Sequence, residues 1–313
     1  MHPGFSVIFL TTLIGAGQGL FLGLYAAELA AALHVVALPP GRGFFVPGVL
    51  LSLAFTGAGA IASLFHLGHP ERAWRAMAMW RTSWLSREGI ALPSFMLAVF
   101  LYGLAHWLEW PATLAIGAVA AVLCLSLFIC TGMIYACIKF LQEWASPLTV
   151  VNYAVLGIAS GFTLASAFAA FTADRLVAAY TAAAIAFTLL GLATRCASLL
   201  RNSRIKRKST LQSATGIHHP RIVQKSQGFM GGSYNTREFF HGRSKSFLRS
   251  VKWIFLALAF ALPLLLLGFS LSHVSAIVLC LAFVVQYAGL IAERWFFFAQ
   301  SNHPQNLYYQ AIS

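Results

Sequence analysis

The sequence predicts an all-α integral membrane protein, a bundle of eight transmembrane helices with a long basic loop between the sixth and the seventh. Hydrophobic residues make up 59% of the 313 residues and charged residues only 9%, and the mean hydropathy is +0.77. These values are typical of membrane proteins and not of soluble ones. Eight apolar runs are long enough to cross a bilayer core of about 30 Å, which takes about 20 helical residues. Because the runs are continuously apolar and do not alternate, we expect helices and not barrel strands.

The eight expected spans form a single transmembrane domain over residues 1–313, without a separate soluble domain. They are residues 5–33, 45–66, 88–108, 112–138, 148–172, 175–200, 251–271 and 274–298. The first run lacks the basic start and the small-residue cleavage pattern of a signal peptide, so we expect it to be retained. Its glycines, Gly15, Gly17, Gly19 and Gly23, form a small-residue face suited to close helix packing. Pro263 should kink the seventh span.

The basic residues gather on one side of the predicted bundle. With eight spans, both termini share a side with the connectors after spans two, four and six. All of the 21 Lys and Arg residues except Arg42 and Arg175 fall on that side. By the positive-inside rule, this side and both termini are cytoplasmic. The net charge of +13 is thus a topology signal, reinforced by contact with anionic membrane lipid. No nucleic-acid-binding module accompanies the charge, so nucleic acid is not an expected partner.

One connector, from Phe65 to Glu88, differs from the apolar rest of the chain because it holds four Arg, three Trp, two His and two Glu. His66 closes the second span and Glu88 opens the third, so we expect the two helix ends to be neighbours. Quinone conversion moves two electrons and two protons, and it needs a proton-exchanging group beside each quinone oxygen. The pKa of histidine is near 6.5, and burial can raise the pKa of a glutamate towards that value. The pair therefore predicts a quinone site.

Aromatic and basic side chains complete this candidate site. Besides His66 and Glu88, the expected quinone contacts are Trp74, Trp80, Arg81, Trp84 and Tyr135. Asn152 and Tyr153 are expected to border the same cavity, and a kink at Pro93 would open room for a ligand. Alternatives stay open: Glu88 as a charge that favours the helix dipole, His66 as an interfacial helix end, and the Trp residues as an ordinary aromatic belt.

Metal centres are not expected in this chain. The five cysteines form no C-x-x-C motif, whereas iron–sulfur ligation needs clustered thiolates. A haem needs two histidines that face each other inside the bundle. His66 belongs to one end of the predicted bundle, and His34, His106 and His273 belong to the other. Neither a haem nor an iron–sulfur cluster is therefore predicted.

The long loop between the sixth and seventh spans, about residues 201–250, is expected to bind a partner. It opens with the basic run 201–208 and continues with an aromatic stretch over residues 228–241. Aromatic residues and Arg are enriched in the cores of protein interfaces. A flexible linker remains the alternative.

Three segments of the chain resemble a known family. Residues 1–20, the run His66-Leu-Gly-His-Pro-Glu-Arg-Ala-Trp74 and the run Trp80-Arg-Thr-Ser-Trp-Leu-Ser-Arg-Glu88 are similar to the membrane-anchor subunit of dimethyl-sulfoxide-reductase-type molybdoenzymes. The resemblance implies an eight-helix, quinone-binding anchor in the bacterial cell inner membrane. It also implies two partners, a four-cluster iron–sulfur subunit and a molybdopterin catalytic subunit. His66 and Glu88 match the family positions implicated in quinol binding.

The predicted orientation distinguishes between two kinds of anchor in this family, those with the motif-bearing face in the periplasm and those with it in the cytoplasm. In dimethyl sulfoxide reductases the face with these motifs looks toward the periplasm, whereas here the charges place it in the cytoplasm. The loop also resembles that of the anchors of cytoplasmic sulfite dehydrogenases. We therefore expect an anchor that passes electrons from sulfite oxidation to ubiquinone or menaquinone. The alternatives are a quinol-oxidising anchor of a dimethyl sulfoxide reductase and, from other classes, a transporter or a passive scaffold.

Overall fold

The computed structural model describes residues 2–35, 41–223, 225, 241–304 and 306, and its regular structure in these ranges is helical throughout. The elements are α1 (Phe5–Ala32), α2 (Arg42–Leu64), the 3-10 helix η1 (Pro70–Met77), α3 (Trp84–Trp107), α4 (Thr113–Ala136), α5 (Pro147–Thr172), α6 (Asp174–Ser203), α7 (Leu211–Thr215), α9 (Lys245–Leu256), the π turn η3 (Ala257–Ala261), α10 (Leu262–Ser272) and α11 (Ala276–Ala299).

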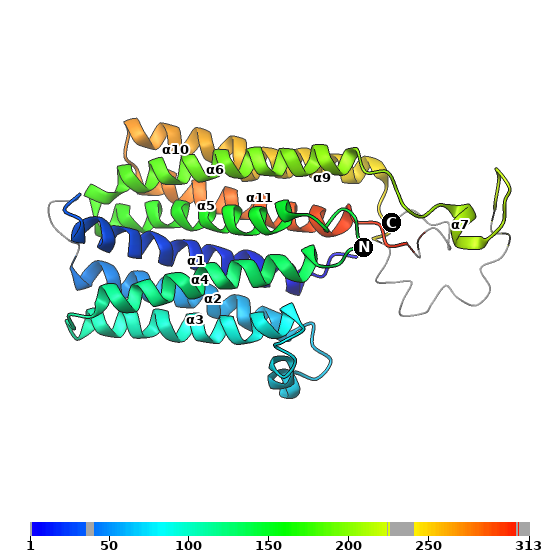
Figure 1. Cartoon of the computed structure of the whole chain (residues 1–313). Helices are drawn as coiled ribbons and strands as arrows, with labels where there is room; N and C mark the ends of the chain where they lie inside the picture. Colours follow the sequence, from blue (N-terminus) through cyan, green and yellow to red (C-terminus); the bar gives the residue numbers. More distant parts are fainter. Residues whose placement is uncertain (1, 36–40, 224, 226–240, 305, 307–313) are drawn as a thin grey trace.

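Eight helices of the described chain are long and apolar enough to span a membrane. They lie roughly side by side in one bundle (Figure 1), with α9, η3 and α10 forming a single span. The predicted fold class is therefore confirmed. The predicted spans agree with these helices to within a few residues, except that the seventh helix begins earlier, at Lys245.

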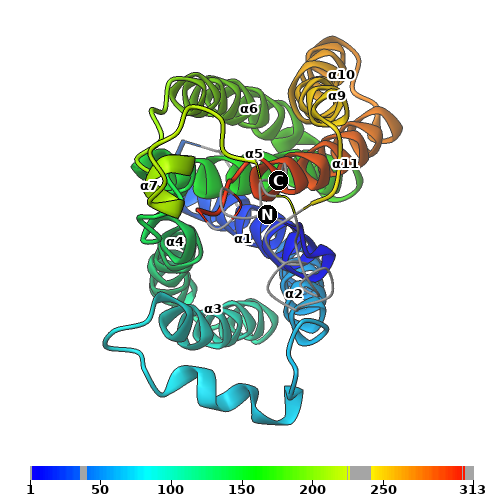
Figure 2. The same ribbon diagram turned by 90° about the vertical axis from the view of Figure 1, so that its right-hand side faces the viewer.

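Both α1 at its start and α11 at its end lie at the same end of the bundle, which we call the terminal face (Figure 1). Seen from that face, α1 and α5 lie at the centre, with α2, α3 and α4 on one side and α6, α9, α10 and α11 on the other (Figure 2). A large buried apolar core lies among α1 to α6, and Phe21 packs edge-on against both Phe95 and Tyr102 in it, with ring centroids 5.6 Å apart. Because the core between the helices is apolar, polar sites are expected near the helix ends, at the terminal face and at the opposite end of the bundle.

Glycine allows α1 and α5 to touch backbone to backbone. A Cβ atom on Gly161 would lie only 2.2 Å from the backbone of Gly19, so no side chain fits there. Close approach of this kind is how membrane helices gain packing energy when lipid is as apolar as their side chains. The small-residue face predicted for the first span is thus the centre of the bundle.

The seventh span changes its hydrogen bonding where the sequence predicted a kink. Pro263 has no N–H to donate to the carbonyl of Ala259, four residues earlier, and the π turn η3 precedes it. Gln286 of α11 bonds this carbonyl from its Nε2 atom at 3.4 Å, and it also donates to Thr188 Oγ1 at 3.0 Å. A freed carbonyl in the bilayer needs such a partner.

Candidate functional site

The ends of α2 and α3 bring His66 and Glu88 to one place at the terminal face. The connector between these helices runs outside them and contains η1 (Figure 2). Ser83 ends the connector as the N-cap of α3, since its hydroxyl accepts a hydrogen bond from the Ser86 N–H at 3.3 Å. Glu88 therefore lies in the second turn of α3, and only 8% of it is exposed.

The Glu88 carboxyl is held from α4. The Thr131 hydroxyl donates to its Oε1 atom at 2.5 Å, and among the described residues no cation forms an ion pair with it. The first turn of α3 contains no acidic residue. Because the helix-dipole effect falls off within that turn, the dipole alternative accounts poorly for Glu88. A buried carboxyl bonded through one oxygen can exchange a proton through the other.

A cavity of about 350 Å³ lies beside this carboxyl. Its volume is at the lower end of the roughly 300–1,000 Å³ typical of small-molecule sites. It is lined by Leu10, Ser63, Leu64, His66, Leu67, Ala73, Trp74, Ala76, Met77, Leu85, Glu88, Gly89, Leu92 and Pro93. The wall is thus mainly apolar, with an indole ring, a thioether and two groups able to exchange protons.

His66 lies beyond the last residue of α2, partly exposed at this cavity. Partial burial of the imidazole lowers the pKa of His66 below its ordinary value near 6.5, because the charged ring loses hydration. The neutral ring therefore dominates at pH 7. It offers one N–H donor and one acceptor nitrogen.

Four of the predicted contacts do not line the cavity. The Arg81 guanidinium lies over the Trp80 ring, 5.5 Å from its centre, and the Arg87 guanidinium lies over the Trp84 ring, 4.2 Å from its centre. Neither tryptophan nor Arg81 lines the cavity. Tyr135 is buried in a separate aromatic cluster. That cluster also contains Trp144, Tyr153, Phe297 and Phe298.

A buried group of charges between α6 and α11 was not predicted from the sequence. Arg195 Nε lies 2.7 Å from Glu293 Oε1, and Arg294 Nη1 lies 3.4 Å from Glu293 Oε2. Ionisable residues inside apolar spans are functional candidates by default, and this rule identifies all three from the sequence. Arg195 and Arg294 were instead counted as basic residues of the terminal face, and Glu293 was not considered.

The far end of the bundle holds another buried titratable pair. His106 Nε2 lies 3.6 Å from Glu28 Oε1, and the His106 ring stacks on Phe45 with centroids 4.0 Å apart. The pair is at the opposite end of α3 from Glu88. Within the described ranges, no three His, Cys, Asp or Glu side chains form a group able to hold a metal ion. That the chain binds neither a haem nor an iron–sulfur cluster stays a prediction from its sequence.

Comparison with known proteins assigns the family. A family model described as DMSO reductase anchor subunit (DmsC) matches residues 1–309. The chain belongs to this family. A sulfite dehydrogenase subunit from Allochromatium vinosum is 52% identical over 326 residues, with 100% of both chains covered. This member of the DMSO reductase anchor family is therefore a membrane anchor of an assembly of several subunits. The family resemblance predicted from the sequence is confirmed.

The predicted docking loop of this anchor is only partly described. The described part of the loop contains α7, which follows the basic run. It also contains His241, the last residue of the aromatic stretch. Most of the aromatic stretch, residues 228–240, lies outside the described residues. The docking role therefore stays a prediction.

Proposed function

We propose that this chain is the quinone-binding anchor of a sulfite:quinone oxidoreductase. The cavity shared by His66 and Glu88 carries the proposal, because it joins an apolar wall to two proton-exchanging groups at the terminal face. The sulfite assignment is supported by the full-length similarity to the sulfite dehydrogenase subunit from Allochromatium vinosum. A bound quinone accepts two electrons and two protons at its two oxygens.

The residues of the cavity fit such a ligand. Trp74 and Met77 offer a flat ring and a polarizable sulfur to a quinone head group. Glu88, protonated and held by Thr131, donates one proton. The second comes through His66, whose ring gives its N–H proton to the other quinone oxygen while its second nitrogen takes a proton from water on the exposed side. The apolar wall keeps bulk water from the Glu88 carboxyl, which is buried.

The remaining partners and the orientation belong to the same proposal. A four-cluster iron–sulfur subunit would lie on the terminal face and supply the electrons, which it would receive from a molybdopterin subunit. In a bacterial inner membrane, the terminal face would be cytoplasmic, because it carries nearly all Lys and Arg residues. Fusions of alkaline phosphatase and of a fluorescent protein to the C-terminus test this side: fluorescence without phosphatase activity is expected.

The deciding experiment is Glu88→Gln in the purified complex. Sulfite-dependent reduction of a soluble quinone analogue should fall roughly a hundredfold, the lower end of the effect of a proton-transferring side chain. Glu109→Gln is the matched control, because Glu109 is exposed and pairs with Arg42 at the far end. An assembled Glu88→Gln complex with the wild-type rate would show that the chain is a scaffold and not a quinone site.

The reverse direction is the second candidate, and the description of the family model favours it. In that case the complex oxidises quinol and reduces dimethyl sulfoxide or a related acceptor. Assays with sulfite plus quinone, and with quinol plus dimethyl sulfoxide, separate the two. A complex that reacts only in the second assay keeps the site and reverses its direction.

A further inference from the structure

The ion group Arg195–Glu293–Arg294 is almost completely buried inside the bundle. Exposure is 2% for Arg195, 0% for Glu293 and 4% for Arg294. The hydration that these ions lose is replaced only in part by their pairing. Two guanidinium groups and one carboxylate leave a net positive charge inside the bundle. The quinone cavity described above does not include any of these residues.

Two tyrosines lie between this group and Glu88, in contact through their rings. The Arg294 guanidinium lies 3.6 Å from the centre of the Tyr153 ring, and Tyr153 stacks on Tyr135 with centroids 5.4 Å apart. Tyr135 lies one turn of α4 after Thr131, which bonds Glu88. Glu88 is close enough to interact electrostatically with both tyrosines. The Tyr153 hydroxyl is buried without a hydrogen-bond partner among the described residues, so a water molecule can bond it. Tyrosine and threonine hydroxyls both donate and accept hydrogen bonds.

The same group is connected with the outside of the protein. A cavity of about 10 Å³ adjoins Arg195 and Glu293, which is room for one water molecule. Asn152 Oδ1 and Arg195 Nη2 are buried in its wall, and neither has a hydrogen-bond partner among the described residues. An acceptor and a donor without partners beside such a space are what a buried water bonds.

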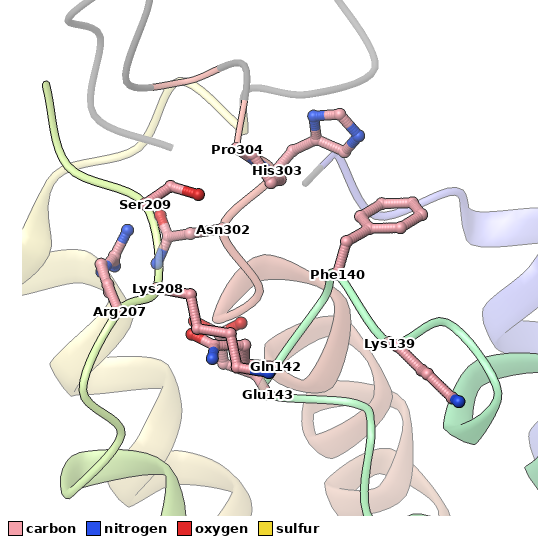
Figure 3. Close-up of a pocket in the computed structure, with 10 residues that line it drawn as sticks. All are labelled: Lys139, Phe140, Gln142, Glu143, Arg207, Lys208, Ser209, Asn302, His303 and Pro304. Carbon is pink, nitrogen blue, oxygen red and sulfur yellow. The ribbon is translucent and has the colours of Figure 1, made fainter. Parts of the chain in front are cut away.

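Glu143 joins this small cavity to an open pocket on the terminal face. It lines both the small cavity and a pocket of about 160 Å³ between the α4–α5 loop, the segment after α6 and the segment after α11. Figure 3 shows Glu143 and Gln142 in the floor of this pocket, with Lys208 above them. The pocket is wide enough for bulk water to reach the carboxyl of Glu143.

We propose that these groups form a proton path from the terminal face to Glu88. It runs from Glu143 through the water site and over bound water to the hydroxyls of Tyr153 and Tyr135, and from there to Thr131, which bonds Glu88. When Glu88 gives its proton to a quinone oxygen, its carboxylate takes one back from the Thr131 hydroxyl. Each donor along the path is then reprotonated by the next, and the last proton comes from water at Glu143. The net positive charge of the ion group stabilises the negative charge that moves outward in this sequence.

This inference rests on the proposed function, and its test separates the two. In the intact complex, Tyr153→Phe removes one hydroxyl and keeps the ring that packs on Tyr135. Quinone reduction should slow about tenfold, with an unchanged KM for the quinone analogue and a larger solvent deuterium isotope effect. Tyr135→Phe and Glu143→Gln should do the same. Tyr180→Phe is the matched control, because the buried Tyr180 hydroxyl donates to Gly23 O near the start of α6, towards the far end of the bundle.

The isotope effect, which is the ratio of the rates in H2O and D2O, distinguishes a proton path from a packing defect. A misfolded fraction lowers both rates equally and leaves their ratio unchanged. Wild-type rates and isotope effects in Tyr153→Phe, Tyr135→Phe and Glu143→Gln, beside an inactive Glu88→Gln, overturn the path and leave the quinone site standing. A fully active Glu88→Gln overturns both. Slowing in Tyr180→Phe equal to that in Tyr153→Phe, with equal isotope effects, also overturns the path.

Discussion

The Thr131 hydroxyl donates a hydrogen bond to the Glu88 carboxyl across the interface of α3 and α4. The contact fixes a carboxyl that nothing else among the described residues bonds. It also gives the cavity a defined orientation of its acidic group. The relationship joins residues 43 positions apart in the sequence.

Removing this hydroxyl should slow the reaction without removing the site. In Thr131→Val, quinone reduction should fall about tenfold, because the carboxylate that forms when Glu88 gives up its proton loses a hydrogen bond. A hydrogen bond to a charged group contributes about 1.5–3 kcal/mol, and each 1.4 kcal/mol is a factor of ten in rate. Thr131→Ser should restore most of the rate. Thr163→Val is the control, because the Thr163 hydroxyl bonds only the Ala159 carbonyl of its own helix among the described residues. Equal rates in Thr131→Val and wild type would contradict the role of this bond.

Trp74 should affect binding and Trp80 should not. Both rings are largely exposed in the isolated chain, 63% and 52%, but only Trp74 lines the cavity. Trp74→Ala should raise the KM for the quinone analogue about threefold to tenfold, the effect of losing one aromatic contact. The KM of Trp80→Ala should equal that of the wild type. Steady-state kinetics of both variants measures this, and a reversed order would shift the site along the connector.

The protonation of His66 should appear in the pH profile. Because partial burial lowers its pKa, the ring is neutral at pH 7 and becomes imidazolium only below its ordinary value of about 6.5. The imidazolium is a stronger proton donor than the neutral ring. Quinone reduction should therefore accelerate as the pH falls from 7 to below about 6.5. His66→Gln should lose this inflection. His69→Gln, whose side chain is exposed and pairs with Glu71, should keep it. An inflection that persists in His66→Gln would assign it to another group.

Gly161 should not tolerate even a methyl group. In Gly161→Ala the new Cβ atom meets the Gly19 backbone, and overpacking of this kind costs about 1–3 kcal/mol. The thermal midpoint of the protein in detergent should fall. Gly268→Ala is the control, because a Cβ atom there has nothing within 4 Å. Equal midpoints for the two variants would mean that α1 and α5 are further apart than described.

The sequence predicted the helices well because each span depends on local hydropathy. It also predicted the meeting of His66 and Glu88, since a short connector keeps two helix ends together. The partners of these residues were less predictable. Thr131 reaches Glu88 from α4, and Tyr135 is buried among side chains of α5 and α11. Such contacts depend on which helices pack together, and the periodicity of one sequence does not specify that.

Charge alone was misleading at Arg195 and Arg294. Counting them as basic residues of the terminal face served the topology, but it hid their pairing with Glu293. The sequence position was also a poor guide at Trp80, which is exposed, and at Trp84, which is half-buried, because neither lines the cavity. Their position in a polar connector suggested ligand contacts, whereas they stack with arginines of the same connector.

Gln286 and Glu293 give α6 and α11 a common register. Gln286 bonds Thr188, and Glu293 pairs with Arg195, so both links join residues 98 positions apart. The two links are seven residues apart on each helix, or about two turns, and therefore lie on the same side of each. Apolar contacts alone specify the register of two membrane helices less strictly than paired polar groups do. Here a slide of one turn would leave a carboxylate and an amide without partners in the bilayer interior, so these two links favour one depth of α11 in the membrane.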